Sequence, residues 1–408
     1  MMKIAIIGGG ASGMLSAITA RKSGADVTVF EKLDRVGKKL LSTGNGRCNI
    51  TNENVLETDD NGKLSHYFGE NSDFAKFAIT QFDNNDLLGF FGDLGVLFRQ
   101  ENDKFYPYSE TASTVLDVLR LYCDKIGVKT VTATQISVVK PHKNGFLVGD
   151  IRFDKVIVAC GGMSCPHLGT DGDGYAILQS FGHTRTKLNP AITQVKTDNK
   201  FTRQLKGIKC NVDLTILENG KKLRTEYGQI LFADYGLSGP PVFQLSSLVN
   251  ENSQNQSFAV DFMPEFSYQQ TLENLQKIVK NPFCENLTTA DLLLPMINKK
   301  VGQIVIKYCG LPLNISAKDL SEKQIKSIAS ALKNMEIKIL GTKGFQNAQV
   351  TFGGVKTCEF DEFSMQSKLC QGLFACGEVL DITGDCGGYN LQWAFSSGVL
   401  AGKAATEC

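Results

Sequence analysis

The first thirty residues alternate between two strand-like patterns and one helix-like pattern. Residues 3–7 form a short run rich in Ile and Ala, which is typical of a buried parallel strand. Residues 14–23 place apolar side chains at helical spacing, and residues 25–30 form a second run rich in β-branched residues. This order predicts a strand, a helix and a second strand, which is how many α/β folds begin.

The chain continues in the same style to about residue 165. Residues 73–91 and 111–125 have the spacing of helices, whereas residues 128–139 and 145–151 alternate between apolar and polar positions like antiparallel strands. Residues 154–162 then form another apolar run that ends in a glycine turn. We expect these segments to complete one α/β sheet.

The pattern changes after residue 190. An alternating, β-rich stretch contains the turn signal Asn219-Gly220, and residues 267–335 then contain amphipathic helical segments with Ser or Thr starts. A strand near residue 350, followed by a last strand, loop and helix, returns to the earlier style. The two ends of the chain are therefore predicted to form one discontinuous domain around an insertion.

The turn after the first strand is a candidate site for binding a ligand. It reads Gly8-x-Gly10-x-x-Gly13 and opens the first helix, and Glu31 ends the second strand. Such a turn lets a pyrophosphate approach the backbone at the positive end of a helix. An acid roughly twenty residues later accepts hydrogen bonds from a ribose. The spacing predicts a dinucleotide site that prefers FAD or NAD over NADP; the alternative is a plain strand–turn–helix with small residues for packing.

Two further glycine-rich loops extend this candidate site. Residues 36–52 combine three glycines with Lys, Arg, Ser and Asn side chains, so they can wrap a phosphate and reach toward a ring system. Residues 375–398 offer carboxylates for a ribitol hydroxyl and a helix start that suits a flavin pyrimidine. The alternatives are a solvated turn and a helix start capped by Asp385. The predicted cofactor contacts are Gly8, Gly10, Ala11, Ser12, Gly13, Glu31, Lys32, Gly37, Lys38, Lys39, Ser42, Gly44, Asn45, Gly46, Arg47, Cys48, Asn49, Thr132, Ala159, Cys160, Gly161, Gly377, Glu378, Asp381, Gly388, Tyr389, Asn390 and Leu391.

The amino-acid composition limits the kinds of partner that the protein is expected to bind. The 408 residues contain 43 Lys and Arg against 42 Asp and Glu, so no single-sign charge attracts a nucleic acid or an anionic membrane. No apolar stretch approaches the ~20 residues that span a bilayer. The first strand begins at residue 3, which leaves no room for a signal peptide. We expect a cytoplasmic protein with a small-molecule substrate and without nucleic-acid or membrane partners.

The twelve cysteines and four histidines show no metal or redox motif. No Cys-x-x-Cys pair occurs, and no Cys/His cluster has the spacing of a zinc site. The cysteines are expected to be small core residues or surface thiols in a reducing compartment. Neither a metal site nor a disulfide-reductase dithiol is predicted.

Four motifs together resemble one family of flavoproteins. They are GGGASG at 8–13, GNGRCNITN at 44–52, GLSGP at 236–240 and GEVLDITGDCGGYNLQWAFSSG at 377–398; TFGGV and SMQSK also fit. From end to end the chain resembles the HI0933-like (BaiN/RdsA) family of NAD(P)/FAD-dependent oxidoreductases, a branch of the two-dinucleotide-binding superfamily. Members of this family are described as aminoacetone-type amine oxidases and as reductases of unsaturated steroid or bile-acid ketones.

The resemblance implies an architecture and a cofactor. The cofactor is FAD, bound non-covalently. The fold class is α/β, with a Rossmann-like FAD-binding domain, an inserted β-barrel-like domain and a helical subdomain. The implied boundaries are 1–190 and 351–408 for the FAD-binding domain, 191–265 and 336–350 for the β-rich insert, and 266–335 for the helical subdomain.

The electron donor is not marked by a second nucleotide fingerprint. Residues 169–176 contain Gly172-x-Gly174, but Ile177 stands at the next position and no clean strand precedes the glycines. Residues 190–350 contain no such pattern. NADH or NADPH, if it is the transient donor, is therefore expected to dock directly against the flavin.

Four residues are candidates for catalysis beside the flavin. Arg47 can hold an oxyanion or a substrate carboxylate, Tyr235 can donate a proton from the insert boundary, and Asn49 and Tyr389 can tune the ring. The alternatives are a pyrophosphate contact for Arg47 and simple packing for the tyrosines. The family's usual Phe-Thr-His before GLSGP is Phe-Ala-Asp here, so no histidine role carries over to Asp234.

Three functions remain open from the sequence. The leading hypothesis is an FAD-dependent oxidoreductase that uses NAD(P)H to reduce a small apolar ketone or enone. The second is a flavin amine oxidase of the aminoacetone type, which passes electrons to oxygen. The third is a non-catalytic flavoprotein that serves as a binding or RNA-modification accessory module. The oligomeric state is not indicated.

Overall fold

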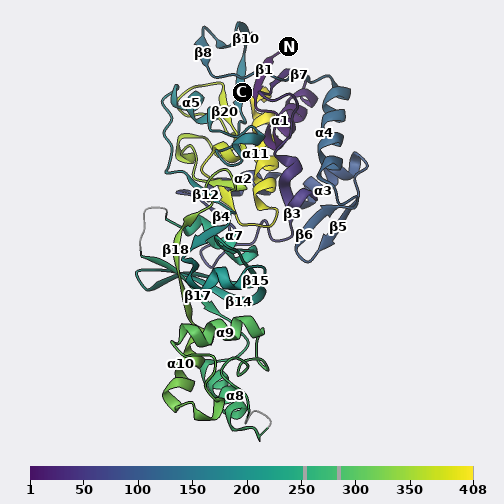
Figure 1. Ribbon diagram of the computed structural model, residues 1–408. Coiled ribbons are helices and arrows are strands. Elements are labelled where there is room, and N and C mark those ends of the chain that lie inside the picture. The colour runs from purple at the N-terminus through teal and green to yellow at the C-terminus, as the bar shows by residue number, and fades with distance from the viewer. Residues whose placement is uncertain (251–254, 283–285, 408) are drawn as a thin grey trace. The chain divides into compact units, whose positions relative to one another are not determined.

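The structure is a computed structural model that describes residues 1–250, 255–282 and 286–407. The chain divides into two compact units (Figure 1). Unit 1 comprises Met1–Ala191 and Phe345–Cys408, and unit 2 comprises Ile192–Gly344. The predicted α/β fold class, with a Rossmann-type domain and a barrel, is confirmed. The finer division into a β-rich insert and a helical subdomain stays a prediction.

Unit 1 is built on a five-stranded parallel sheet with the order β20-β11-β1-β2-β7. The apolar residues of its central strands are buried on both faces, as continuous apolar runs predict. The strand β20 comes from the end of the chain and pairs with β11, so both ends of the sequence share one sheet. The bounds are β1 Lys3–Ile7, β2 Asp26–Phe30, β7 Lys129–Val131, β11 Lys155–Val158 and β20 Leu373–Ala375.

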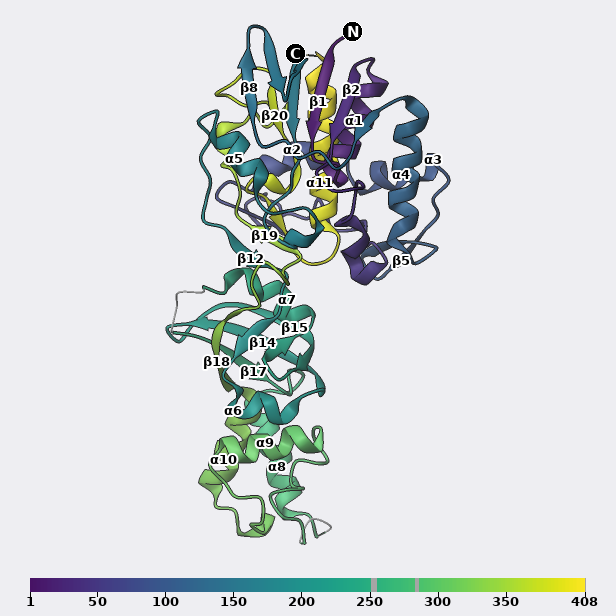
Figure 2. The same cartoon turned by 45° about the horizontal axis from the view of Figure 1, so that its top comes forward.

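Two helices from opposite ends of the chain pack side by side in unit 1. They are α1 (Ala11–Lys22) and the last helix α11 (Tyr389–Glu407), purple and yellow in Figure 1 and Figure 2. Two glycines of α11 make this approach possible. An ideal Cβ on Gly398 would lie 2.5 Å from the carbonyl oxygen of Ser12, and one on Gly402 would lie 2.4 Å from that of Ser16. The backbones therefore meet more closely than any side chain would allow.

The remaining elements of unit 1 correct two expectations. The helix predicted over 73–91 is two helices, because Asp83 accepts hydrogen bonds from the N–H groups of Asn85 and Asp86 and caps a new start. The strand predicted over 128–139 is interrupted: β7 joins the parallel sheet, and a separate sheet β10-β9-β8 begins at residue 139. The bounds are α2 Phe74–Gln81, α3 Asn84–Asp93, α4 Ala112–Ile126, α5 Asp173–Gln179, β3 Thr51–Asn52, β4 Tyr67–Phe68, β5 Phe98–Glu101, β6 Lys104–Pro107, β8 Val139–His142, β9 Gly145–Val148, β10 Ile151–Phe153, β12 Asn189–Ala191, β19 Val350–Phe352 and β21 Thr383–Gly384.

Unit 2 contains a closed barrel with the order β13-β16-β15-β14-β17-β18. Alternate residues of β14 point inward and are buried, which is the pattern of a strand with one solvated face. The predicted turn Asn219-Gly220 joins β14 to β15, with φ of 51° and 74° as a two-residue hairpin turn requires. The bounds are β13 Val195–Thr197, β14 Lys209–Glu218, β15 Lys221–Phe232, β16 Gly236–Ser238, β17 Gln256–Asp261 and β18 Met335–Thr342.

Three helices of unit 2, α8, α9 and α10, lie within the segment 267–335 that the sequence predicts to be helical, and two short helices, α6 and α7, precede it. Ser267 and Ser321 each form a capping box with the glutamine three residues later, so both helices start where Ser and Gln spacing indicates. A core of apolar side chains from barrel and helices is continuous within the unit. The bounds are α6 Asn199–Thr202, α7 Pro240–Leu245, α8 Tyr268–Lys280, α9 Lys299–Tyr308 and α10 Glu322–Lys333.

Candidate functional site

The glycine turn between β1 and α1 leaves room for a ligand at one position. An ideal Cβ on Gly8 would lie 2.4 Å from the carbonyl oxygen of Ala159, and one on Gly13 would lie 1.9 Å from that of Gly8. Both glycines therefore serve close packing. Gly10 differs, because no heavy atom of the described residues outside its immediate neighbours lies within 4 Å of its ideal Cβ. Gly10 is also the N-cap of α1, and no described side chain caps it.

The carboxylate of Glu31 is fixed at the carboxyl end of β2. Its Oε2 accepts a hydrogen bond from the N–H of Gly9 at 2.9 Å, and its Oε1 accepts one from the N–H of Leu33 at 2.9 Å. The acid is half-buried and held directly beside the glycine turn. Each oxygen keeps acceptor capacity beyond one bond. This is the position from which a carboxylate binds a ribose.

The loop after β2 bends through left-handed backbone conformations. Gly44, Asn45 and Cys48 have φ between 56° and 59°, which non-glycine residues adopt rarely. The loop delivers Asn49, whose side chain is only 8% exposed. Its Oδ1 is buried and has no hydrogen-bond partner within the described part of the chain. A buried amide oxygen without a partner costs free energy unless a ligand or water satisfies it.

Arg47 is held by the hairpin of β5 and β6. Its Nη2 lies 2.5 Å from Oε1 of Glu101, and its guanidinium lies 4.2 Å from the ring centroid of Tyr106. The hydrogen bond to Glu101 holds the pKa of Arg47 above its usual value, so the charge is permanent. Its predicted role toward an oxyanion requires the guanidinium to leave or share this carboxylate.

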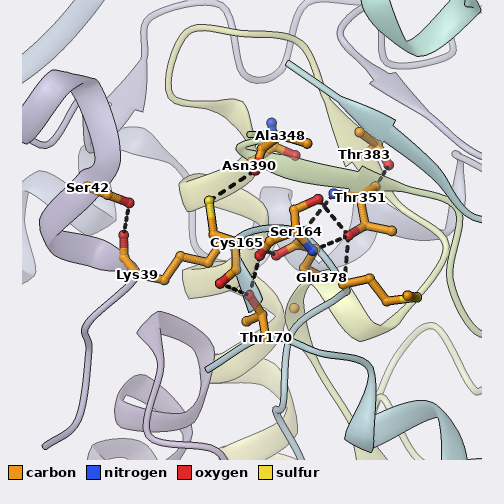
Figure 3. Close-up of polar contacts among 12 residues, drawn as sticks. Lys39, Ser42, Ser164, Cys165, Thr170, Ala348, Thr351, Glu378, Thr383 and Asn390 are labelled. Atoms are coloured by element: carbon orange, nitrogen blue, oxygen red, sulfur yellow. Dashed lines mark hydrogen bonds and ion pairs between the residues drawn. The ribbon is translucent and has the colours of Figure 1, made fainter. Parts of the chain in front are cut away.

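Glu378 connects segments that are far apart in the sequence (Figure 3). It lies in a 3₁₀ turn, Gly377–Val379, and its Oε2 is 2.7 Å from Nζ of Lys39. Its Oε1 accepts a hydrogen bond from the N–H of Thr351 at 2.8 Å. Both charged side chains of the pair are about four-fifths buried. The carboxylate is thus held in one orientation by two donors.

Thr351 extends this network to the loop after β11. Its Oγ1 accepts hydrogen bonds from the N–H groups of Met163 at 2.8 Å and Ser164 at 3.1 Å. Thr170 in turn donates to the carbonyl oxygen of Ser164, as Figure 3 shows. The sequence alone marked the TFGGV motif but assigned no role to Thr351. Its function is to align the 161–170 loop with Glu378.

The start of α11 is packed against aromatic rings. Tyr389 is 3% exposed; it stacks on His66 with centroids 4.5 Å apart and meets Tyr67 edge-on at 5.8 Å. Gly388 precedes it with φ of 104°, and its ideal Cβ would lie 2.5 Å from the carbonyl group of Thr51. The paired glycines therefore open the helix as predicted and let it press against β3.

Asp381 precedes this helix and is fixed from the other side. Its Oδ2 accepts a hydrogen bond from the N–H of Glu70 at 2.9 Å. Burial raises the pKa of Asp381 above the usual value for an aspartate. A buried carboxylate can accept further hydroxyl donors, and the contact of Asp381 with a ribitol chain stays a prediction.

Comparison with known proteins identifies the family of this chain. Residues 2–404 match the HI0933-like protein Rossmann domain. The chain belongs to the HI0933-like family. It is 36% identical over its whole length, and over the whole of the relative, to a 3-dehydro-bile acid delta(4,6)-reductase of Clostridium scindens. It is 31% identical to a ribosomal RNA dihydrouridine synthase of Haemophilus influenzae, over 96% of this chain and 95% of the relative.

The solved structures agree with the HI0933-like assignment at the level of fold. A 3-ketosteroid delta1-dehydrogenase from Sterolibacterium denitrificans matches with a TM-score of 0.51, 12% identity and full coverage of both chains. The chain is thus an enzyme of a flavin-dependent oxidoreductase family. No helix within the described residues is both long enough and apolar enough to cross a membrane.

The residues of this HI0933-like chain fit a flavin dinucleotide. The open space beside Gly10, the uncapped start of α1 and the fixed carboxylate of Glu31 suit the adenosine and pyrophosphate part. The unpartnered Oδ1 of Asn49 supplies a further acceptor. Among the described residues, no group of three or more His, Cys, Asp or Glu side chains is placed to hold a metal ion.

Some predicted site residues have other partners or lie elsewhere. Lys32 pairs with Asp171 and Asp173. Tyr235 belongs to unit 2, where the ammonium group of Lys343 lies 4.5 Å from its ring centroid. Other predicted residues have local roles in unit 1: Lys38 pairs with Asp34, Ser42 donates to the carbonyl oxygen of Lys39, Thr132 is exposed beyond β7, Cys160 donates its thiol to the carbonyl oxygen of Ile7, and Asn390 bonds the backbone of Gly384.

Proposed function

We propose that this chain is an FAD-dependent reductase that uses NADH or NADPH to saturate a carbon–carbon double bond conjugated to a carbonyl group in a small, largely apolar molecule. The observation that supports this most is the 36% identity, over the full length of both chains, with a relative named as a reductase of an unsaturated bile acid. The ribosomal RNA relative is named for a product in which a ring double bond beside a carbonyl is also saturated. The two named activities therefore share one type of bond reduction.

The residues of unit 1 divide the binding of the cofactor among them. The N–H groups at the start of α1 would hold the pyrophosphate, and Glu31 would accept hydrogen bonds from the adenosine ribose. Asn49 and Asp381 would contact the remaining part of the molecule. FAD bound there supplies hydride transfer through its isoalloxazine ring.

Reduction of an enone also needs a proton for the carbon next to the carbonyl group. Burial raises the pKa of Tyr389, so its hydroxyl keeps its proton at neutral pH. A protonated hydroxyl can donate a hydrogen bond to a carbonyl oxygen. Tyr389 at the start of α11 is therefore our candidate for the group that orients the substrate carbonyl. Arg47 is the second candidate, because its guanidinium is charged at every physiological pH.

A second candidate function, reduction of an RNA base, is favoured by the distribution of charge. Residues 192–344 contain 19 Lys and Arg against 14 Asp and Glu, whereas the rest of the chain contains 24 against 28. The near-zero total thus conceals a basic unit 2, and a basic surface attracts RNA through its phosphates. Against this, the relative that acts on ribosomal RNA is less similar to this chain than the bile-acid reductase. The expected absence of a nucleic-acid partner stays a prediction.

The test is an anaerobic titration of the purified holoprotein. NADH and NADPH are added separately while the flavin absorbance near 450 nm is followed, and then a Δ4-3-ketosteroid, a ribosomal RNA fragment or an amine is added. Bleaching by a nicotinamide and recovery with the steroid support the proposal. Recovery with RNA alone would favour the second candidate. If only the amine bleaches the flavin and air restores its absorbance, the amine-oxidase hypothesis would replace both proposed functions.

A further inference from the structure

A chain of three titratable side chains runs from solvent to the start of α11. The carboxylate of Glu57 lies 3.1 Å from Nε2 of His66, and Nδ1 of His66 lies 3.1 Å from Oδ2 of Asp385. Exposure falls along the chain, from 55% for the side chain of Glu57 to 25% for His66 and 5% for Asp385. One end can exchange protons with water, and the other end is buried beside the predicted cofactor residues of α11.

The backbone holds these groups in register. The strands β4 and β21 pair directly beside them, and the N–H of Asp385 donates to the carbonyl oxygen of His66 at 3.0 Å. The imidazole ring stacks on Tyr389 at 4.5 Å with an interplanar angle of 23°. A change in the charge of His66 therefore alters the electrostatic potential at the start of α11, because the imidazole contacts both Asp385 and Tyr389.

A structural role alone explains this arrangement poorly. A histidine that only filled space would not need two carboxylates, one on each ring nitrogen. Burying Asp385 is also costly unless its charge is compensated. Histidine is the side chain whose charge changes near neutral pH, so it suits a group that takes up and releases protons during a reaction.

We propose that Glu57, His66 and Asp385 form a proton relay that supplies the reductive reaction in unit 1. The proposal rests on the function proposed above. In each turnover the double bond gains a hydride and a proton, and the reduced nicotinamide loses the hydride. Asp385 passes the proton that the double bond gains toward the reacting carbon, Nδ1 of His66 then returns a proton to Asp385, and the imidazole recovers one from solvent through Glu57. His66 is thus a positioning and proton-supplying residue, not one that touches the substrate.

The two carboxylates around His66 favour its protonated form. Burial pulls the pKa of His66 down, but the hydrogen bonds to Asp385 and Glu57 outweigh it, so its pKa lies above the usual value. The titratable groups that contact the ring are these two carboxylates and Tyr389 on α11, and Tyr389 in turn meets Tyr67 of β4 edge-on.

The test measures the midpoint potential of the bound cofactor against pH, with dithionite as the reductant. A proton relay coupled to the site adds an inflection at the pKa of His66, which NMR of labelled histidine reports among only four histidines. We expect the inflection in the wild type and in the control His142→Gln, and its loss in His66→Gln. Asp385→Asn keeps the shape of the carboxylate and is expected to lower the pKa of His66.

The outcomes separate this inference from the proposed function. An inflection that persists unchanged in His66→Gln overturns the relay, and so does a pKa of His66 that is the same in the oxidised and reduced proteins. Neither readout needs a nicotinamide or a substrate, so failure to find an enone substrate does not affect them. If His66→Gln loses the cofactor, Asp385→Asn decides alone. With a substrate in hand, His66→Gln is expected to lower turnover about 10- to 100-fold at pH 8.

Discussion

Unit 1 and unit 2 obtain their order in different ways. Unit 2 is one continuous segment in which a long hairpin, β14–β15, and successive capped helices follow one another, so most of its architecture is visible in local patterns. Unit 1 joins the two ends of the chain: β20 completes a sheet begun by β1, and α11 packs on α1. Gly398 and Gly402 bring the backbones of these two helices, from opposite ends of the sequence, into close contact. The comparison teaches that the cofactor unit is assembled from distant pieces that must fit at the backbone.

The largest expected effect comes from filling such a contact. Gly402→Ala places a Cβ 2.4 Å from the carbonyl oxygen of Ser16, so we expect unit 1 to lose about 3 kcal/mol of unfolding free energy. In unit 2, Gly302→Ala brings the new Cβ to 2.9 Å from Cβ of Leu293, which is a less severe overlap than 2.4 Å from a carbonyl oxygen and should cost less. Urea unfolding followed by the fluorescence of Trp393 in α11 measures unit 1.

Gly89→Ala is the matched control for this experiment. Gly89 lies inside α3, and no described atom lies within 4 Å of its ideal Cβ, so the substitution should raise stability by about 0.5–1 kcal/mol through helix propensity. Equal losses for Gly402→Ala and Gly302→Ala would remove the contrast between the units.

The next effect concerns cofactor affinity. Glu31→Gln removes the charge that accepts from the backbone and from the ribose, so the dissociation constant for FAD should rise about 10- to 100-fold. Asp26→Asn removes the same charge at the exposed start of β2 and should leave the constant unchanged. Equilibrium titration of the apoprotein measures both, and equal behaviour of the two variants would contradict the assignment of Glu31.

A smaller effect is expected from pH. His183 is buried in unit 1, with Nδ1 2.9 Å from Glu359 and Nε2 2.8 Å from Oγ of Ser367. Burial lowers the pKa of His183 below the value of 6.5 that applies when the chain is unfolded, so the unfolded state binds more protons. Stability from this group is present above pH 6.5 and is lost as pH falls below it. Urea midpoints from pH 5 to 8 should show this slope in the wild type and a shallower slope in His183→Gln.

The smallest effect is expected on the surface of unit 2. Lys206 and Asp234 form an ion pair at 2.8 Å, but both side chains are more than half exposed. Lys206→Met should leave the urea midpoint unchanged, because exposed pairs contribute little. A large loss of stability in Lys206→Met would instead show that this ion pair has a structural role in unit 2.

The sequence by itself determined the parts of this protein that depend on neighbours in the chain. The Asn219-Gly220 hairpin and the Ser starts of two helices follow from residues a few positions apart, the glycine turn with Glu31 follows from a spacing of roughly twenty residues, and the family motifs indicated a flavin dinucleotide. The structure found each of these elements where the pattern predicts it.

Only the tertiary structure decided which distant residues meet. The strand predicted over 128–139 is divided because its first part enters a parallel sheet, a choice that no local periodicity records. Glu378 pairs with Lys39, and Asp385 pairs with His66, although more than 300 residues separate the partners in each pair. The sequence around a carboxylate or a histidine does not indicate its partner. Such ion pairs form only after the sheet and helices have brought distant parts of the backbone together. The candidate relay and the orientation of Glu378 therefore became visible only in the folded chain.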